Sequence, residues 1–143
     1  MDYPKNFGNF AAGIFSIHKD EPMRFSVEQD NDIVIFTLKE PKLDGVNAPD
    51  VKAEFLIICQ PNVEALVIDL ANVGECDNNG VSALLLANRL MKEHDAPVFL
   101  TGVSEQVRSL LELSMVAHNF EFRESVEETL TEFSDAEEFD DEY

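Results

Sequence analysis

One short polar turn, Asp77-Asn78-Asn79-Gly80, carries the strongest chemical signal in the sequence. It follows a continuous apolar run, residues 65–70, that has one carboxylate near its end, and it precedes an apolar helical segment. A turn that opens a helix leaves several backbone N–H groups free at the positive end of the helix dipole. An anion placed there is bound favourably. The simpler interpretation is that Asn79 only serves as the N-cap of the helix.

The sequence lacks the residue patterns that catalysis or metal binding requires. Its three histidines stand in unrelated contexts, and no metal-binding spacing, nucleophile elbow or phosphate-binding glycine loop is present. Cys59 and Cys76 have no partner motif, so we expect two reduced and mostly buried thiols. The alternative is that Cys76, beside the turn, is a reactive thiol. We therefore expect no enzymatic activity, no metal site and no cofactor.

The charge of the chain restricts its partners. The formal net charge is −19, from 29 acidic and 10 basic residues. Such a surface repels nucleic acids and anionic membranes. No apolar run approaches the roughly 18 residues of a membrane-spanning helix. A signal peptide is a poor interpretation of the N-terminus, so we expect a cytoplasmic protein.

Hydrophobic periodicity predicts an α/β fold, with a mixed β-sheet packed against helices. An opening hairpin is followed by alternating helices and buried strands, which implies parallel neighbours and right-handed crossovers. The expected elements are strands at 23–28 and 33–38, a helix from Ala48 or Pro49 with Asn47 as its cap, a strand at 65–70, a helix at 81–93, a strand at 97–101, a helix after Ser104, an extended piece at 120–122 and a helix at 125–133.

Composition divides the chain into three parts. Residues 1–22 have no sustained period and are expected to form a loose N-terminal extension. Residues 23–133 form the folded domain. Residues 134–143 are so acidic that we expect a disordered tail.

The helix after the turn has two distinct faces. Leu84, Ala87 and Met91 share the face expected to lie on the sheet. The opposite side carries Ser82, Arg89 and Glu93, with leucines at 85 and 86 beside this polar stripe. These leucines could be covered by loops of the chain or could form the contact surface for a partner.

The order of these motifs resembles the STAS domain, and in particular the bacterial anti-sigma factor antagonists. In that family a strand ending in hydrophobic-Asp-Leu leads through a short turn to Asp-Ser-Ser-Gly, which opens an apolar helix. Here Val67-Ile68-Asp69-Leu70 and Asp77-Asn78-Asn79-Gly80 take those places. Leu43-Asp44 with Asn47-Ala48 and, later, Thr101-Gly102-Val103 resemble further family segments. The resemblance runs from Met23 to about Leu130.

The resemblance implies a protein-binding switch. Family members bind an anti-sigma factor with a histidine-kinase-like ATPase fold, and this kinase phosphorylates the second serine of Asp-Ser-Ser-Gly. Asn79 occupies the phosphoacceptor position here, and neither it nor Asn78 has a hydroxyl. The resemblance therefore implies a monomer or weak dimer that stays in the partner-binding state. The residues expected to contact the partner are Asp44, Asp77, Asn78, Asn79, Gly80, Ser82, Leu85, Leu86 and Arg89.

Two other interpretations remain open at this point. The chain could be a STAS subunit of a lipid-transport or stressosome-like assembly. It could also be a nucleotide-sensing module that holds phosphates at the turn, although the lack of nearby lysine or arginine argues against this.

Overall fold

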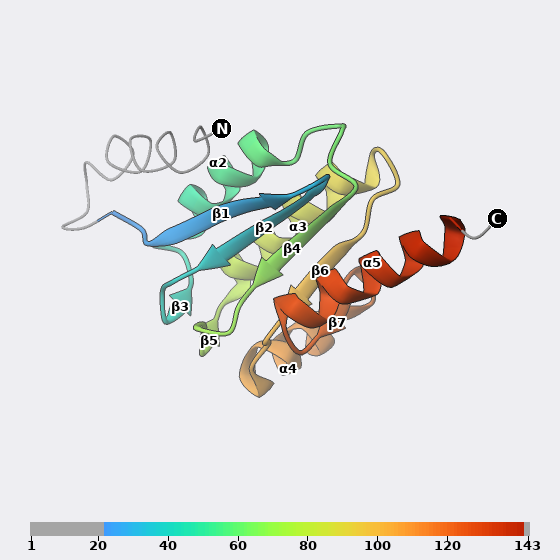
Figure 1. Cartoon of the computed structure of the whole chain (residues 1–143). Helices are drawn as coiled ribbons and strands as arrows, with labels where there is room; N and C mark the ends of the chain where they lie inside the picture. Colours follow the sequence, from blue (N-terminus) through green and yellow to red (C-terminus); the bar gives the residue numbers. More distant parts are fainter. Residues whose placement is uncertain (1–21, 142–143) are drawn as a thin grey trace.

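A five-stranded mixed sheet forms the centre of the molecule (Figure 1). The computed structural model describes residues 22–141, with side chains described to residue 134. The strands lie in the order β1-β2-β4-β6-β7, with β1 antiparallel to β2 and every other neighbouring pair parallel. Their bounds are β1 Phe25–Asp30, β2 Ile33–Leu38, β4 Ala65–Asp69, β6 Val98–Thr101 and β7 Glu121–Arg123. The predicted mixed sheet is confirmed.

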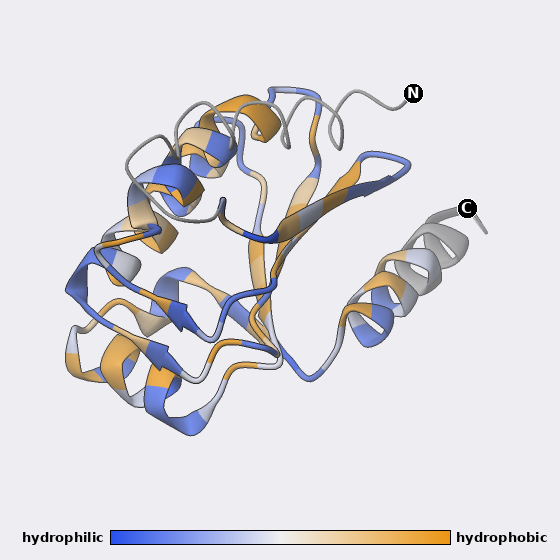
Figure 2. Cartoon of the chain, turned by 90° about the vertical axis from the view of Figure 1, so that its left-hand side faces the viewer, coloured by the Kyte–Doolittle hydropathy of each residue, from blue (hydrophilic) through white to orange (hydrophobic). Residues whose placement is uncertain are grey.

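Helices cover both faces of this sheet. α2 (Ala48–Ile58), α3 (Asn78–Lys92) and α4 (Glu105–Leu113) pack on one face, and α5 (Val126–Asp141) packs on the other. Figure 2 shows α5 standing apart from the other helices across the sheet. A short 3-10 helix, η1 (Ala117–Asn119), links α4 to β7.

The central strand β4 explains the two-sided arrangement. Leu66 and Ile68 point into the large core beneath α2, α3 and α4, whereas Ala65 and Val67 face the smaller core beneath α5. All four side chains are at most 1% exposed. Burial of one such aliphatic side chain contributes about 1.5 to 3 kcal/mol to folding. The prediction that this run forms a strand buried on both faces is confirmed.

The hairpin is tighter than the sequence indicated. β1 and β2 pair from Phe25 with Leu38 to Asp30 with Ile33, which leaves only Asn31 and Asp32 in the turn. Asn31 has a positive φ of 58°. Asparagine tolerates this left-handed conformation better than most residues. β1 therefore extends two residues beyond its predicted end, and the loop has two residues and not the predicted four.

Two further elements differ from the predicted boundaries. α3 begins at Asn78 and not at Val81, and α5 continues to Asp141, beyond the predicted end at Phe133. Residues 1–21 and 142–143 lie outside the described residues. The division into an N-terminal extension, a domain and a tail therefore stays a prediction.

A second, two-stranded sheet lies at the edge where the parallel strands end. β3 (Lys42–Leu43) and β5 (Glu75–Cys76) pair in parallel. Neither was predicted, because a strand of two residues has no hydrophobic period. This small sheet joins the loop after the hairpin to the turn before α3.

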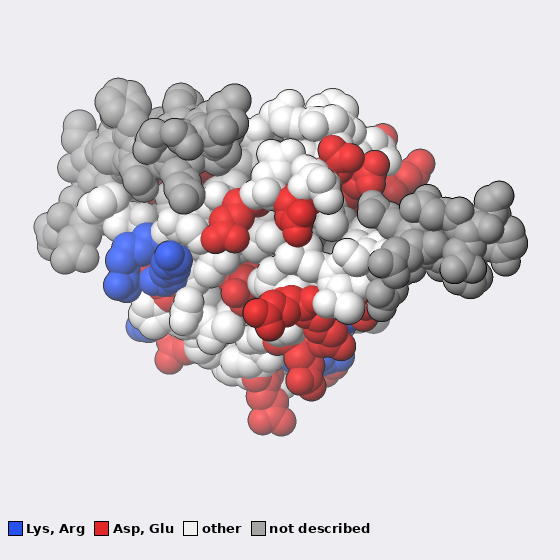
Figure 3. All heavy atoms as spheres, in the orientation of Figure 1, with Lys and Arg blue, Asp and Glu red and all other residues white. Residues whose placement is uncertain are grey.

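Acidic side chains prevail among the charged groups on the α5 side. Figure 3 shows several separate groups of red atoms on a mostly white face, while blue atoms gather mainly near the start of β1. No helix within the described residues is long and apolar enough to cross a membrane.

Candidate functional site

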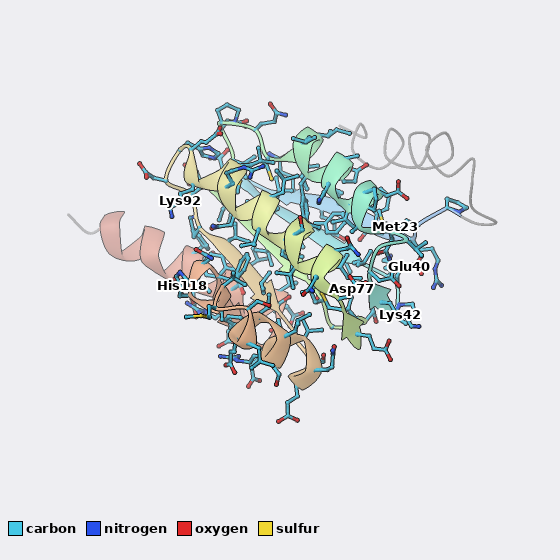
Figure 4. The ribbon with its side chains drawn as sticks, turned by 180° about the vertical axis from the view of Figure 1, so that it is seen from behind. Met23, Glu40, Lys42, Asp77, Lys92 and His118 are labelled. Carbon is cyan, nitrogen blue, oxygen red and sulfur yellow. The ribbon has the colours of Figure 1, made fainter. Side chains whose placement is uncertain are left out.

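The polar turn is held in place by the β3–β5 sheet. The backbone N–H of Asp77 donates to the carbonyl of Leu43 at 3.3 Å, directly after the paired residues Leu43 and Cys76. The side chain of Gln106 in α4 accepts the backbone N–H of Cys76 at 3.2 Å. Residues far apart in sequence therefore fix the turn from both sides. Figure 4 shows Asp77 at the start of α3, beside the loop that carries Lys42.

Asp77 is the N-cap of α3. Its backbone is extended, and its carboxylate accepts the backbone N–H groups of Asn79 at 2.9 Å and Gly80 at 3.1 Å. The prediction that Asn79 caps the helix is wrong. Both residue types are good caps, but the small sheet ends at Cys76 and so places Asp77 at the last extended position before the helix.

The carboxylate of Asp77 collects several donors. The N–H of Gly80 has the largest effect and lowers the pKa of Asp77, whereas partial desolvation raises this pKa. The N–H and side-chain amide of Asn79 and the N–H of Gly45 lower the pKa further. The ionised carboxylate is thus the form that the turn stabilises.

Asn79 turns its side chain back over the turn. Its amide interacts with the Asp77 carboxylate, and its nitrogen would lie 3.0 Å from a Cβ added to Gly45. A larger residue at position 45 would therefore press on Asn79. The exposed Asn79 is held by its own turn and by the loop after β3.

Gly80 is required for close packing beneath the turn. A Cβ at this position would collide with the Leu43 carbonyl oxygen and the Cys76 sulfur, and would lie 2.9 Å from the Leu43 Cγ. The first turn of α3 can therefore approach β3 only because residue 80 has no side chain.

The loop between β3 and α2 has its own internal bonds. The Asn47 side chain donates to the Lys42 carbonyl at 2.8 Å and accepts the Asp44 N–H at 3.0 Å. Asn47 stands at the N-cap position of α2, which begins at Ala48 as predicted, but its side chain makes no capping hydrogen bond. The reason is that closing this loop uses both polar atoms of the Asn47 amide. Asp44 in turn accepts the Val46 N–H at 3.0 Å.

Cys76 is a buried thiol beneath the site. Its sulfur donates to the carbonyl of Asp77 at 3.4 Å, and its side chain is 8% exposed. Burial, with the charges of Asp77 and Asp44, raises its pKa to about 12. The thiol is therefore protonated at neutral pH, which argues against the reactive-thiol alternative. No cluster of histidine, cysteine, aspartate and glutamate in the part of the chain that the structure describes could hold a metal ion.

A family model of the STAS domain matches residues 24–129. The chain belongs to the STAS domain family. The resemblance found in the sequence is confirmed, and the Asp77 turn lies within the matched region.

Solved STAS structures share the fold at low sequence identity. An anti-sigma factor antagonist from Mycobacterium paratuberculosis is 18% identical with a TM-score of 0.67, covering 76% of this chain and 92% of that one. A STAS domain protein from Planctomyces limnophilus is 16% identical with a TM-score of 0.69, at 75% and 94% coverage. The phosphorylated form of SpoIIAA from Bacillus is 18% identical with a TM-score of 0.62, at 77% and 99% coverage. No curated protein matches the chain significantly.

The two faces of α3 lie as the sequence predicted. Leu84, Ala87 and Met91 are fully buried against the sheet, whereas Ser82 and Arg89 are exposed. Leu85 and Leu86 are half-buried, and Leu85 packs against the core. These two leucines are thus less available to a partner than the sequence suggested, because neighbouring elements cover part of each.

One exposed apolar residue beside the Asp77 turn was not predicted from the sequence. Val46 is 67% exposed and follows Gly45, whose backbone N–H interacts with the Asp77 carboxylate. Its neighbours in sequence are polar, so no period marked it. The Asp77 turn and the neighbouring loop after β3 together present polar groups and one aliphatic side chain to solvent.

Proposed function

We propose that this STAS protein acts by binding an anti-sigma factor, and so regulates transcription indirectly. The observation that carries the proposal is the exposed start of α3, where Asp77, Asn78 and Asn79 stand open to solvent on a rigid support. Its family membership supports a binding role, and structures with this fold include anti-sigma factor antagonists. We expect the partner to be of the kinase type, and the complex to form in the cytoplasm.

The proposed contact surface comprises two neighbouring groups of residues. The turn and the loop after β3 supply its centre, and the exposed side of α3 extends it. A few residues near the centre of an interface carry most of the binding energy, because they are the most completely desolvated in the complex. The proposed members are Asp44, Val46, Asp77, Asn78, Asn79, Gly80, Ser82, Leu85, Leu86 and Arg89.

We further propose that this surface is not switched by phosphorylation at the turn. Asn79 lies at the position of the family's phosphoacceptor and has no hydroxyl. Its uncharged amide interacts with the Asp77 carboxylate, as a serine hydroxyl can. A phosphate there would add negative charge beside Asp77, and like charges this close repel. Residue 79 therefore stays uncharged, and the turn keeps its unphosphorylated, partner-binding form.

Calorimetry with the kinase-type anti-sigma factors of the source cell tests the binding. Val46→Asp, at the proposed surface, should weaken the affinity by about tenfold or more. Leu113→Asp is the matched control, because Leu113 is also exposed, at 82%, but lies at the far end of α4. Equal losses for both variants, or no binding by the unmodified protein, would contradict the proposal.

A phosphate-transfer assay tests the missing switch. With the kinase-type partner and ATP, the unmodified chain should gain no phosphate at the turn, and Asn79→Ser should gain one. Asn78→Ser places the same hydroxyl one residue earlier and serves as the control. Phosphate on the unmodified turn would overturn this part of the proposal, and mass spectrometry of the peptide would reveal it.

A further inference from the structure

A hollow of about 480 Å³ lies between α4, β7 and the start of α5. Figure 1 shows these three elements close together at one end of the sheet. The hollow sits at the carboxyl ends of β6 and β7, the edge at which parallel sheets in α/β folds bind ligands. It is separate from the Asp77 turn, with which it shares no residue. Its lining comprises Gly102, Val103, Arg108, Phe122, Arg123, Glu124 and Glu128.

Two arginines meet in this hollow, in a chain with only 10 basic residues. The guanidinium of Arg108 lies 4.2 Å above the centre of the Phe122 ring, which fixes its plane. The Nε of Arg108 pairs with Glu112 at 3.5 Å. Arg108 is thus oriented by an aromatic ring and one carboxylate.

Arg123 is fixed even more firmly. Its Nε donates to both carboxylate oxygens of Glu132, at 2.8 and 3.0 Å, and its Nη1 donates to the Phe122 carbonyl at 2.8 Å. Its Nη1 also lies 3.9 Å from a carboxylate oxygen of Glu121. Among the described residues, the bonds of Arg108 and Arg123 use Nε of both and Nη1 of Arg123, which leaves both terminal nitrogens of Arg108 and the Nη2 of Arg123. Preoriented guanidinium donors remain available to a ligand.

Two acidic residues, Glu124 and Glu128, also line the hollow and keep their negative charge, so any anion must bind on the arginine side. The carboxylate of Glu128 accepts the Glu124 N–H at 3.2 Å, and the N–H of Glu128 donates to the Ser125 hydroxyl at 3.1 Å. This reciprocal capping engages Glu128 at the start of α5. α4 also begins beside the hollow, with Ser104 as its cap. The positive ends of two helix dipoles therefore lie at this edge.

We propose that this hollow binds a phosphate group, either inorganic phosphate or a small phosphomonoester, with Arg108 and Arg123 as its donors. Planar guanidinium groups match the oxygens of phosphate and form charge-assisted hydrogen bonds with it. The hollow beside the Asp77 turn is less suited to an anion, because three acidic residues and no arginine line it, and its Lys42 pairs with Glu75 at 3.7 Å. A phosphate ligand would therefore bind at the sheet edge and not at the turn.

Titration of the full chain by ¹H–¹⁵N NMR tests the proposal, with inorganic phosphate and glycerol phosphate as separate probes and acetate as a third. The backbone signals of Gly102, Val103 and Glu124 should shift and saturate at millimolar phosphate or phosphomonoester. Arg108→Gln should weaken this binding by about tenfold or more. Arg108 is half exposed, so this variant should keep the fold.

Lys92→Gln is the matched control, because it removes the same charge from the end of α3, at the opposite edge of the sheet (Figure 4). It should leave the titration unchanged. Stronger binding of glycerol phosphate than of phosphate identifies a phosphomonoester, and the reverse identifies the free anion. Absence of saturable shifts, equal shifts with acetate, or equal weakening by both variants would overturn the proposal.

Discussion

The carboxylate of Asp77 accepts the backbone N–H of Asn79 at 2.9 Å, so the helix cap and the residue that we propose as the phosphoacceptor equivalent are directly bonded. The side-chain amide of Asn79 interacts with the same carboxylate. A change of charge at residue 79 must therefore act on the cap as well as on a partner. This coupling gives the turn a stability that can be measured without any partner.

Asn79→Asp should lower the melting temperature and weaken partner binding. The new carboxylate would face that of Asp77, in place of an amide that interacts favourably with it. Asn78→Asp adds the same charge to the first turn of α3 without replacing that amide, and an acidic residue there interacts favourably with the helix dipole. Thermal unfolding of both variants decides the matter. An equal effect of the two would show that the amide of Asn79 does not matter.

Asp77→Asn should be less stable than the unmodified protein at neutral pH, with a difference that shrinks in acid. The folded-state pKa of Asp77 lies below its unfolded value, chiefly because of the Gly80 N–H. Its ionised form therefore stabilises the fold above about pH 4, and this contribution is lost as the pH falls through the lowered pKa. Urea unfolding between pH 7 and pH 2 measures it. A pH-independent difference would contradict the assignment.

Gly80→Ala should destabilise the protein by about 1 to 3 kcal/mol, the usual cost of overpacking. The added methyl group would strike the Leu43 carbonyl and the Cys76 sulfur, of which the first is backbone and cannot rotate away. Gly74→Ala is the control, because a Cβ there meets only the Pro41 carbonyl at 4.0 Å. Denaturant unfolding of both should separate them clearly. A stable Gly80→Ala variant would mean that α3 can move away from β3.

Glu54→Gln should stabilise the protein at neutral pH. Glu54 is 5% exposed in α2, and its carboxylate has no hydrogen bond or ion pair with another described residue. Burial raises the pKa of Glu54 in the folded protein. As the pH rises through the ordinary pKa of a glutamate, this side chain therefore ionises in the unfolded chain before it does so in the folded one. The contribution of Glu54 to the stability of the unmodified protein therefore falls from about pH 4 upwards, and the variant lacks this loss.

The matched control for Glu54 is Glu64→Gln, at an exposed position just before β4. Calorimetric melting of both variants at pH 7 and pH 4 completes the test. The gain should appear only for Glu54→Gln and should vanish at the lower pH. A gain that persists at pH 4 would point to an effect other than ionisation.

The order of strands and helices could be predicted because it depends on local pattern. The apolar run of β4 and the helical spacing of Leu84, Ala87 and Met91 result from the burial of one or both faces of these elements. Such burial produces a hydrophobic pattern that can be seen in the sequence. The family motif lies in the same segment, so its recognition also needed no tertiary information. The boundaries of β1 and α3 shifted by two or three residues, as strand pairing and capping dictated.

The details of the candidate site needed the tertiary structure. Asp77 and Asn79 are both good caps, and only the pairing of β3 with β5 selects Asp77. In the loop after β3, the Asn47 side chain bonds to Lys42 and Asp44, so it makes no capping bond to α2. Val46 is exposed, whereas Leu85 packs against the core, and neither could be told from the local pattern.

The sequence by itself therefore determined the fold, the family and the position of the polar turn, because periodicity and short motifs are local properties of the chain. Only the tertiary structure decided which side chains meet. Arg108 and Arg123 lie on different elements, and they share a hollow because β6 and β7 end at the same edge of the sheet. Contacts of this kind depend on how strands pair and helices pack, which local sequence does not encode.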